Sequence, residues 1–252
     1  MPTDCSRELP TIAVIIPAVN EEAAIGDVIR AIPRDLVTEI IVVDGGSRDA
    51  TVHLARRAGA RVVTEPRRGF GRALATGVAA TTSDLLAFID GDGSEDASAL
   101  PRIAMPIARG EADLVLGART HAEPGALLGH QRLGNAIACS LISLRWHQRI
   151  TDLPSFKAIR RHDLLALGLT EATYGWTVEM IVKAAQRGWR IREVPLTYRR
   201  RIGGESKVSG NAVASLGASV AILRVLVRHV VGAGAGRQVP LLSELDGEVG
   251  AE

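Results

Sequence analysis

The chain has 252 residues, a formal net charge of +2, and 46% hydrophobic residues. This length and composition indicate a globular chain able to bury the core of one sizeable domain. The two cysteines, Cys5 and Cys139, have neither paired nor metal-ligand spacing, which excludes a disulfide framework and fits a reducing compartment. There is no signal-peptide pattern and no run of about 18 apolar residues, so we expect a cytoplasmic chain without a membrane span.

Short apolar runs alternate with amphipathic stretches along the first half of the chain. The runs that predict β-strands are residues 11–17, 39–44, 60–65, 84–90 and 112–118. The helical candidates are residues 20–32, 47–58, 69–81 and 97–109, the first two beginning at Asn20 and Ser47. Strand followed by helix, repeated four times, predicts an α/β fold with a mostly parallel central sheet flanked by helices on both faces.

Polar segments follow three of the predicted strands where those strands end. They are residues 17–21, 44–47 and 90–94. Ligands of parallel sheets bind at the carboxyl ends of the strands, so these segments mark one edge as the binding edge. Carboxylates converging there would repel one another without a cation, and oxygen ligands suit Mg²⁺ or Mn²⁺.

The segment FIDGDGSED, residues 88–96, is the candidate for such a metal site. Mg²⁺ keeps few protein ligands and completes its shell with water and phosphates, so Asp90 and Asp92 suggest a phosphate-bearing substrate. The same triplet is also ordinary turn chemistry. It does not open a calcium loop, because Pro101 stands at the twelfth position. These residues alone support a surface turn and a metal site about equally.

Nine segments, in order, resemble those of family 2 glycosyltransferases, and in particular of dolichyl- and polyprenyl-phosphate mannosyltransferases. They are IIPAVNEE, IIVVDGGSRDAT, GFGRALATG, FIDGDGS, GART, TDLPSFKAIRR, YGWTVEM, REVPLTYRRR and GGESKVSG. The likeness covers about residues 11 to 211. It implies a GT-A fold, a nucleotide-diphosphate sugar donor such as GDP-mannose or UDP-glucose, and inversion at the anomeric carbon.

The resemblance also implies which residues contact the donor. The implied nucleoside contacts are Pro17, Val19, Glu21, Val43 and Asp44. The implied phosphate and metal contacts are Asp90, Gly91, Asp92, Ser94, Arg119 and one of Gln131 or Arg132, with Asp92 the foremost metal ligand. The family often has an aromatic residue where this chain has Val19, and usually an aspartate where it has Gly45.

Charge that develops on a leaving diphosphate needs a metal and cationic donors. The resemblance gives the cationic role to Arg201 and Lys207, and lets Gly203 and Gly204 close the backbone over the donor. A polyprenyl phosphate is already an anionic nucleophile, whereas a sugar hydroxyl needs a general base. Asp152 and Glu179 are the base candidates, and Glu179 is equally suited to orienting its loop or binding the acceptor.

Several of these residues also have plain structural interpretations. Asn20, Glu21 and Glu22 suit a helix N-terminus, the glycines of GFGRALATG suit a strand-to-helix connection, and most arginines of RIREVPLTYRRR suit a solvated face. We expect an N-terminal extension (1–9), a GT-A domain (10–211), an amphipathic helix (212–231) packed on the domain or lying at a bilayer, and a mobile tail (232–252).

The expected function is a metal-dependent hexosyltransferase that acts on a polyprenyl phosphate, cytoplasmic or peripheral to the membrane. The expected cofactor is Mg²⁺ or Mn²⁺, and we expect no nucleic-acid partner. The alternatives are transfer to a soluble hydroxyl acceptor and a non-catalytic nucleotide-sugar-binding relative, the latter suggested by Gly45. The sugar, the base and the oligomeric state stay open.

Overall fold

The structure, a computed structural model, describes residues 10–127, 129–203, 222–229 and 240–242. Its strands are β1 (Ile12–Ala18), β2 (Glu39–Asp44), β3 (Arg61–Thr64), β4 (Leu85–Phe88), β5 (Leu114–Ala122), β6 (Lys157–Arg160) and β7 (Ile191–Tyr198). Its helices are α1 (Ile25–Ala31), α2 (Thr51–Arg57), α3 (Phe70–Ala79), the short 3₁₀ helix η1 (Ala97–Ala99), α4 (Leu100–Ala108), α5 (Gly129–Trp146), α6 (Arg161–Leu167) and α7 (Gly175–Gln186). Residues 222–229 form a further helical segment.

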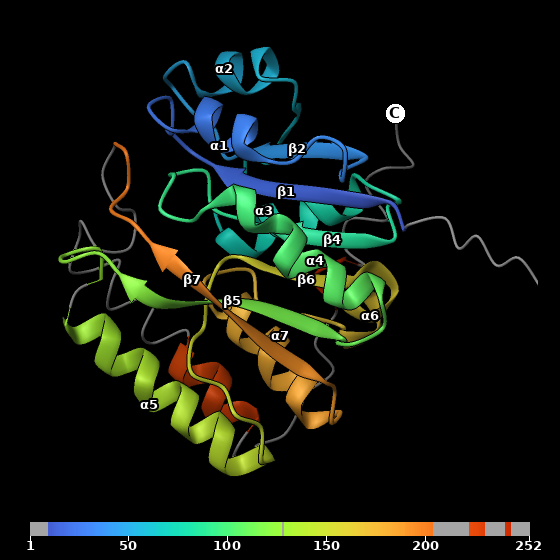
Figure 1. Cartoon of the computed structure of the whole chain (residues 1–252), viewed down its shortest axis with the longest axis vertical. Helices are drawn as coiled ribbons and strands as arrows, with labels where there is room; N and C mark the ends of the chain where they lie inside the picture. Colours follow the sequence, from blue (N-terminus) through green and yellow to red (C-terminus); the bar gives the residue numbers. More distant parts are fainter. Residues whose placement is uncertain (1–9, 128, 204–221, 230–239, 243–252) are drawn as a thin grey trace, which may run out of the picture.

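A seven-stranded sheet runs through the centre of the molecule in the order β3-β2-β1-β4-β6-β5-β7 (Figure 1). Neighbouring strands are parallel except around β6, which is antiparallel to both β4 and β5. The prediction of a mostly parallel sheet flanked by helices is therefore confirmed. The antiparallel β6 has a consequence for the site, because the loop that precedes it arrives at the same edge as the ends of the parallel strands.

Helices cover both faces of the sheet. Alternate residues of β1 point to opposite faces, so Val14 and Ile16 pack with α1, α2 and α4 while Ile15 packs with α3 and α7. The second layer also contains α5, α6 and the helical segment 222–229. Strands buried on both faces explain the continuous apolar runs of the sequence.

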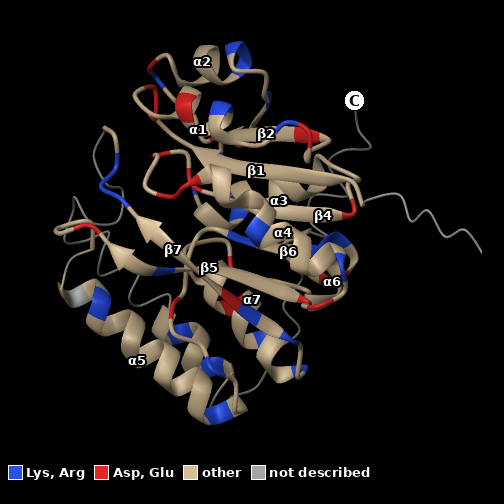
Figure 2. Cartoon of the chain, viewed as in Figure 1, with Lys and Arg blue, Asp and Glu red and all other residues tan. Residues whose placement is uncertain are grey.

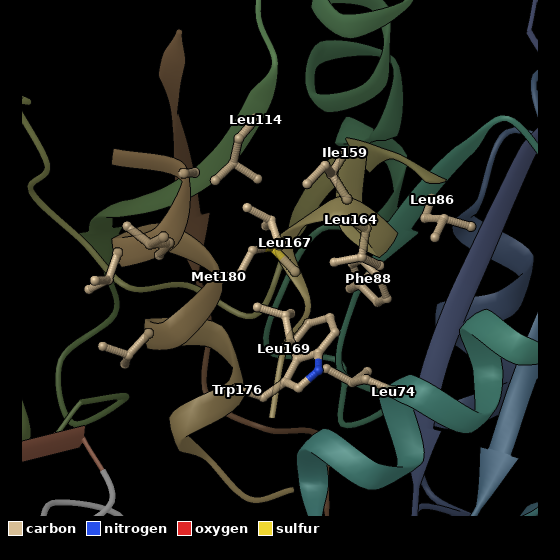
Figure 3. Close-up of a cluster of buried hydrophobic side chains, with 14 of the residues drawn as sticks. Leu74, Leu86, Phe88, Leu114, Ile159, Leu164, Leu167, Leu169, Trp176 and Met180 are labelled. Carbon is tan, nitrogen blue, oxygen red and sulfur yellow. The ribbon is translucent and has the colours of Figure 1, made fainter. Parts of the chain in front are cut away.

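The larger buried cluster lies between the sheet and the layer of α3, α6 and α7 (Figure 3). At its centre the rings of Phe88 and Trp176 meet edge to face, with centroids 5.2 Å apart at an interplanar angle of 72°. Leu74 and Leu169 lie beside the indole in the same view. This contact fixes the end of β4, and thus the start of the acidic loop, against the first turn of α7.

Two helix starts differ from those predicted. The helices begin at Ile25 and Thr51, not at Asn20 and Ser47. The side-chain oxygen of Asn20 accepts a hydrogen bond from the backbone N–H of Arg48 at 2.8 Å, and the Ser47 hydroxyl accepts one from the N–H of Asn20 at 2.9 Å. These polar side chains connect the loops after β1 and β2 to each other, so they are not available to cap their own helices.

The helical segment 222–229 packs on the second layer through Val225 and Leu226, which are buried. Arg224 and Arg228 approach the carboxylate of Glu171 at 3.4 and 3.3 Å. Apolar contacts and ion pairs therefore attach the described part of this segment to the domain. Among the described helices, none combines the length and apolar character that crossing a bilayer requires.

Candidate active site

The ends of several strands meet at one edge of the sheet. Ala18 at the end of β1 pairs with Asp44 at the end of β2. Because β6 runs antiparallel to β4, Lys157 at the start of β6 pairs with Phe88 at the end of β4. The loop 151–156 therefore lies beside the acidic loop that begins at Asp90.

A cleft of about 1510 Å³ opens along this edge. Most of the predicted site residues line it, namely Pro17, Val19, Glu21, Val43, Asp90, Gly91, Asp92, Arg119, Gln131, Arg132, Asp152 and Arg201. Asp44, Ser94 and Glu179 lie outside the lining, and Gly204 and Lys207 fall outside the described residues. Residues far apart in the sequence thus form one site.

The loop after β2 is shaped by a buried carboxylate. Asp44 accepts hydrogen bonds from the backbone N–H groups of Gly46 and Ser47 at 3.1 Å, and Gly46 adopts a φ of 89° that favours glycine. A Cβ at Gly45 would stand 2.6 Å from a methyl carbon of Val19. Because Gly45 has no side chain, it leaves room for the branched side chain of Val19, and the two departures from the pattern that the sequence resembles are structurally linked.

Acidic side chains from two loops meet Arg201 beside the cleft. The Arg201 guanidinium lies 2.8 Å from the Glu21 carboxylate and 3.5 Å from that of Asp92. Asp92 also accepts hydrogen bonds from the backbone N–H and hydroxyl of Ser94, at 2.9 and 2.6 Å. These contacts hold Asp92 in place and set Ser94 next to it.

Asp90 lies in an environment that disfavours its negative charge. Burial raises the pKa of Asp90, the charge of Asp92 raises it further, and a hydrogen bond from Ser155 and the charge of Lys157 oppose this. A cation bound among these carboxylates would relieve the same repulsion. The carboxylates of Asp90 and Asp92 and the hydroxyl of Ser94 are hard oxygen donors suited to Mg²⁺ or Mn²⁺.

The carboxylates do not form a complete metal site. The described part of the chain contains no group of three or more His, Cys, Asp or Glu side chains arranged to hold an ion. Mg²⁺ is commonly bound by one or two carboxylates and takes its other ligands from water and substrate phosphates. The residues present therefore fit a metal that binds together with a diphosphate.

Sequence reasoning missed two buried charged residues behind Asp90. One Glu95 oxygen accepts a hydrogen bond from the N–H of Phe156 at 2.9 Å. The Lys157 ammonium donates to the carbonyls of Pro154 and Ser155 and to the Thr177 hydroxyl, at 3.2, 2.9 and 3.0 Å. Both residues tie the loop 151–156 to its surroundings. The available signals were the acidic run that contains Glu95 and the scarcity of lysine in the chain.

Arg119 and Asp152 form a two-pronged ion pair. The Nε and Nη2 atoms of Arg119 donate to the two Asp152 oxygens at 2.8 and 2.7 Å, and the Arg119 N–H adds a third bond of 2.8 Å. Burial works against a charged Asp152, but the hydrogen bonds and charge of Arg119 outweigh it and lower the pKa of this carboxyl. The guanidinium also lies over the ring of Tyr198, 5.3 Å from its centroid.

Glu179 is only 1% exposed. One carboxylate oxygen accepts hydrogen bonds from the N–H groups of Thr170 and Glu171 at 2.9 and 2.8 Å, and the other lies 2.7 Å from the Lys183 ammonium. Burial disfavours its charge, but the hydrogen bond and charge of Lys183 lower its pKa. The sequence left three roles open for Glu179: a general base, an acceptor-binding residue, or a residue that orients its loop. These contacts fit the last of the three.

The three consecutive arginines of RRR have different contacts. The N–H of Arg199 donates to the carbonyl of Ser94 at 2.8 Å, and the guanidinium of Arg200 donates to the carbonyl of Pro124 at 2.8 and 2.6 Å. Of the three, Arg201 lines the cleft. Arg201 follows the end of β7, and this position brings its side chain to the acidic loop.

Apolar side chains of α5 and of the segment 222–229, which lie side by side in Figure 1, line one part of the cleft, which we call its apolar end. Ile137 and Leu141 of α5 line it together with Ile222, Leu223 and Leu226 of the segment 222–229. Glu21, Asp90 and Asp92 give another part of the cleft its charge. The ion pair of Arg119 and Asp152 also lines the cleft. One cleft therefore offers both a charged surface and a hydrocarbon surface.

Comparison with known proteins gives this site a family. Residues 13–168 match Glycosyl transferase family 2. An uncharacterized glycosyltransferase of Mycobacterium tuberculosis is 38% identical over 205 residues, which are 81% of this chain and 93% of that protein. The dolichyl-phosphate hexose transferase of Haloferax volcanii is 34% identical over 200 residues, 78% of this chain and 86% of that protein.

Solved structures give the same result. Glucosyl-3-phosphoglycerate synthase of Mycobacterium tuberculosis, in complex with Mn²⁺, uridine diphosphate and glucosyl-3-phosphoglycerate, superposes with a TM-score of 0.71. It is 28% identical, and the match covers 90% of this chain and 82% of that one. The predicted GT-A fold is thereby confirmed. With its fold, its cleft and these relatives in agreement, the chain belongs to the family 2 glycosyltransferases.

Proposed function

We propose that this glycosyltransferase moves a hexose from a nucleotide-diphosphate sugar to a polyprenyl phosphate, with inversion at the anomeric carbon. One observation carries the proposal. The cleft runs from the carboxylates of Asp90 and Asp92 to an apolar end formed by Ile137, Leu141 and Leu223. A diphosphate suits the first end, and an acceptor with a charged head and a hydrocarbon tail suits the remainder.

The donor is a GDP- or UDP-sugar in this proposal. Pro17, Val19 and Val43 line the cleft beside the loop shaped by Asp44, where we place the nucleoside. The solved relative binds uridine diphosphate, which supports a donor of this class. Because Val19 replaces the common aromatic and Gly45 the common aspartate, these two positions do not assign the base.

We propose that a Mg²⁺ or Mn²⁺ ion is held by Asp92 and Asp90, with Ser94 supporting Asp92. Bound there, the metal would neutralise negative charge on the departing nucleotide diphosphate. Mn²⁺ is present in the complex of the solved relative. Arg201 lies 3.5 Å from Asp92 and supplies a second positive charge beside the same group. By family resemblance Lys207 has a similar task.

The state of Asp152 supports the proposed acceptor. Its pKa is lowered by Arg119, so this carboxylate is a weak proton acceptor at neutral pH. A phosphate oxygen is already anionic and needs positioning more than deprotonation. Arg119 and Arg132, both in the cleft lining, are suited to hold such a head group. The Haloferax volcanii relative, a dolichyl-phosphate hexose transferase, supports this acceptor class.

A soluble hydroxyl acceptor is the second candidate. The 28% identity to glucosyl-3-phosphoglycerate synthase over most of the chain favours it. In that case a base is required, and Asp152 is the candidate in the cleft lining because Glu179 lies outside it.

Two measurements test the proposal. Purified protein with Mn²⁺ should show a thermal shift with one nucleotide sugar, because a ligand that binds the folded state stabilises it by mass action. The same donor should then transfer its sugar to detergent-solubilised polyprenyl phosphate. Transfer to 3-phosphoglycerate in place of the lipid would establish the second candidate instead.

A further inference from the structure

Helix α5 is apolar on two opposite faces. One face is buried against the domain through Ala138, Cys139 and Ile142. The other exposes four large apolar side chains, with exposed fractions of 63% for Leu133, 53% for Ile137, 40% for Leu141 and 77% for Leu144. An amphipathic surface helix normally places polar side chains on that outer face.

The four exposed side chains form one stripe, which we call the outer α5 stripe (Leu133, Ile137, Leu141 and Leu144). At about 100° per residue, their positions fall within an arc of about 80°. Leu223 and Val227, one turn apart in the helical segment 222–229, are also exposed, at 58% and 47%. A grouped apolar surface of this kind marks an interaction site more often than scattered exposed leucines do.

The charged residues in the stretch of chain that contains α5 have a single sign. Residues 124–151 contain no aspartate or glutamate, and Arg132, Arg145 and Arg149 lie among them. Arg132 and Arg145 fall on opposite sides of the stripe on the helix surface. Figure 2 shows blue near both ends of α5 and no red along it. Two copies of this face would bring like charges together, whereas an anionic surface would be attracted.

The stripe is continuous with the active-site cleft. Ile137 and Leu141 belong to the stripe and also line the apolar end of the cleft. Leu223 is likewise exposed and lines that end. Hydrocarbon that covers the stripe therefore meets the cleft at Ile137 and Leu141.

We propose that the outer α5 stripe is a docking surface for an anionic lipid bilayer. Leu133, Leu144 and their neighbours would enter the interfacial region, while Arg145 meets lipid phosphates. This goes beyond the proposed function, because it assigns a membrane-binding surface as well as an acceptor. It also places the bilayer contact on α5, since Arg224 and Arg228 of the C-terminal segment already pair with Glu171.

The experiment is co-sedimentation of the full chain with phosphatidylglycerol-rich vesicles and with phosphatidylcholine vesicles. We expect binding to the anionic vesicles that weakens with added salt, and little binding to the neutral ones. The double variant Leu133→Glu with Leu144→Glu should bind at least about tenfold more weakly. Leu165→Glu, at an exposed leucine of α6, is the matched control and should bind like the wild type.

Circular dichroism and the donor-induced thermal shift establish that each variant is folded. The proposal is wrong if the wild type ignores anionic vesicles at low salt or if the double variant binds them as the wild type does. It is also wrong if the chain is a dimer in solution that the double variant converts to a monomer. Transfer to detergent-solubilised polyprenyl phosphate reports on the proposed function separately, since Leu133 and Leu144 lie outside the cleft lining.

Discussion

The two ends of the cleft are built differently. At the donor end, side chains bind the backbone of neighbouring loops, as Asn20 does to Arg48 and Glu22 does to Ala50, at 2.8 and 2.9 Å. At the acceptor end, α5 and the segment 222–229 offer apolar side chains that are partly open to solvent, such as Ile137 and Leu223. Fixed polar contacts suit a ligand of defined shape, and an open apolar wall suits a long hydrocarbon chain.

The largest expected effect is at the charged end. Asp92→Ala should lower turnover at least about thousandfold, because it removes the proposed metal ligand and the partner of Arg201. Steady-state kinetics with Mn²⁺ and isothermal titration with the nucleotide sugar measure this. Asp96→Ala removes a carboxylate of the same acidic segment whose partner, among the described residues, is Ser98, and it should leave turnover nearly unchanged. Unaltered donor affinity in Asp92→Ala would refute the assignment.

The junction of the two ends should respond less strongly. Asp152→Asn and Arg119→Lys should each lower turnover on polyprenyl phosphate by about tenfold to hundredfold, because each loosens the paired geometry. The double variant should be little worse than either single one, since both remove the same interaction.

This junction has a matched control in the chain. Arg190 and Asp113 form an ion pair of the same two-pronged type at the other end of β5, with bonds of 3.0 and 2.6 Å. Asp113→Asn should therefore leave turnover unchanged. If the losses of turnover in Arg119→Lys and Asp152→Asn added up in the double variant, the two side chains would act independently. That result is expected if Asp152 is a base.

A smaller effect is expected at the apolar end. Leu223→Glu should raise the KM for a long polyprenyl phosphate by about tenfold, because a carboxylate replaces an apolar wall. The KM for the nucleotide sugar should not change. Assays in detergent with long-chain and short-chain acceptors measure the KM for the acceptor and the KM for the nucleotide sugar separately. Leu165→Glu is the control. If the wild type and Leu223→Glu had equal KM values for the long polyprenyl phosphate, the apolar end would not bind the acceptor.

The smallest effect on catalysis is expected behind the site. Glu179→Gln should lower the free energy of unfolding by about 1–3 kcal/mol, because it weakens the bonds to Thr170 and Glu171 and breaks the pair with Lys183. Turnover of the folded protein should stay within about twofold. Denaturant titration and kinetics on the same preparation measure both. If the variant lost most of its turnover but kept its full stability, Glu179 would have a direct role in catalysis.

The sequence predicted the donor end better than the acceptor end. Strand periodicity and the position of Asp90 and Asp92 after a buried strand were sufficient to place the acidic loop at the carboxyl edge of a parallel sheet. Neither the strand β6 nor its antiparallel course was predicted, and this strand brings Lys157 and the loop before it to that edge. Periodicity reports which face of a strand is buried, but it does not report strand direction.

The remaining misses have a similar cause. Asn20 and Ser47 have the residue types of helix caps, but in the structure they bind each other's loops. The apolar wall could not be predicted either, because α5 and the segment 222–229 are about 80 residues apart in the sequence and each alone resembles an ordinary packed helix. Such contacts depend on tertiary proximity, which local patterns do not encode.

The most direct test of the two-ended cleft is a competition for one donor. Purified enzyme with Mn²⁺ and the nucleotide sugar identified by thermal shift is offered equal concentrations of polyprenyl phosphate in detergent and 3-phosphoglycerate. We expect the sugar to appear almost entirely in the lipid product, with Leu223→Glu reducing that product selectively. Sugar found mainly on 3-phosphoglycerate, with no effect of Leu223→Glu, would contradict the account.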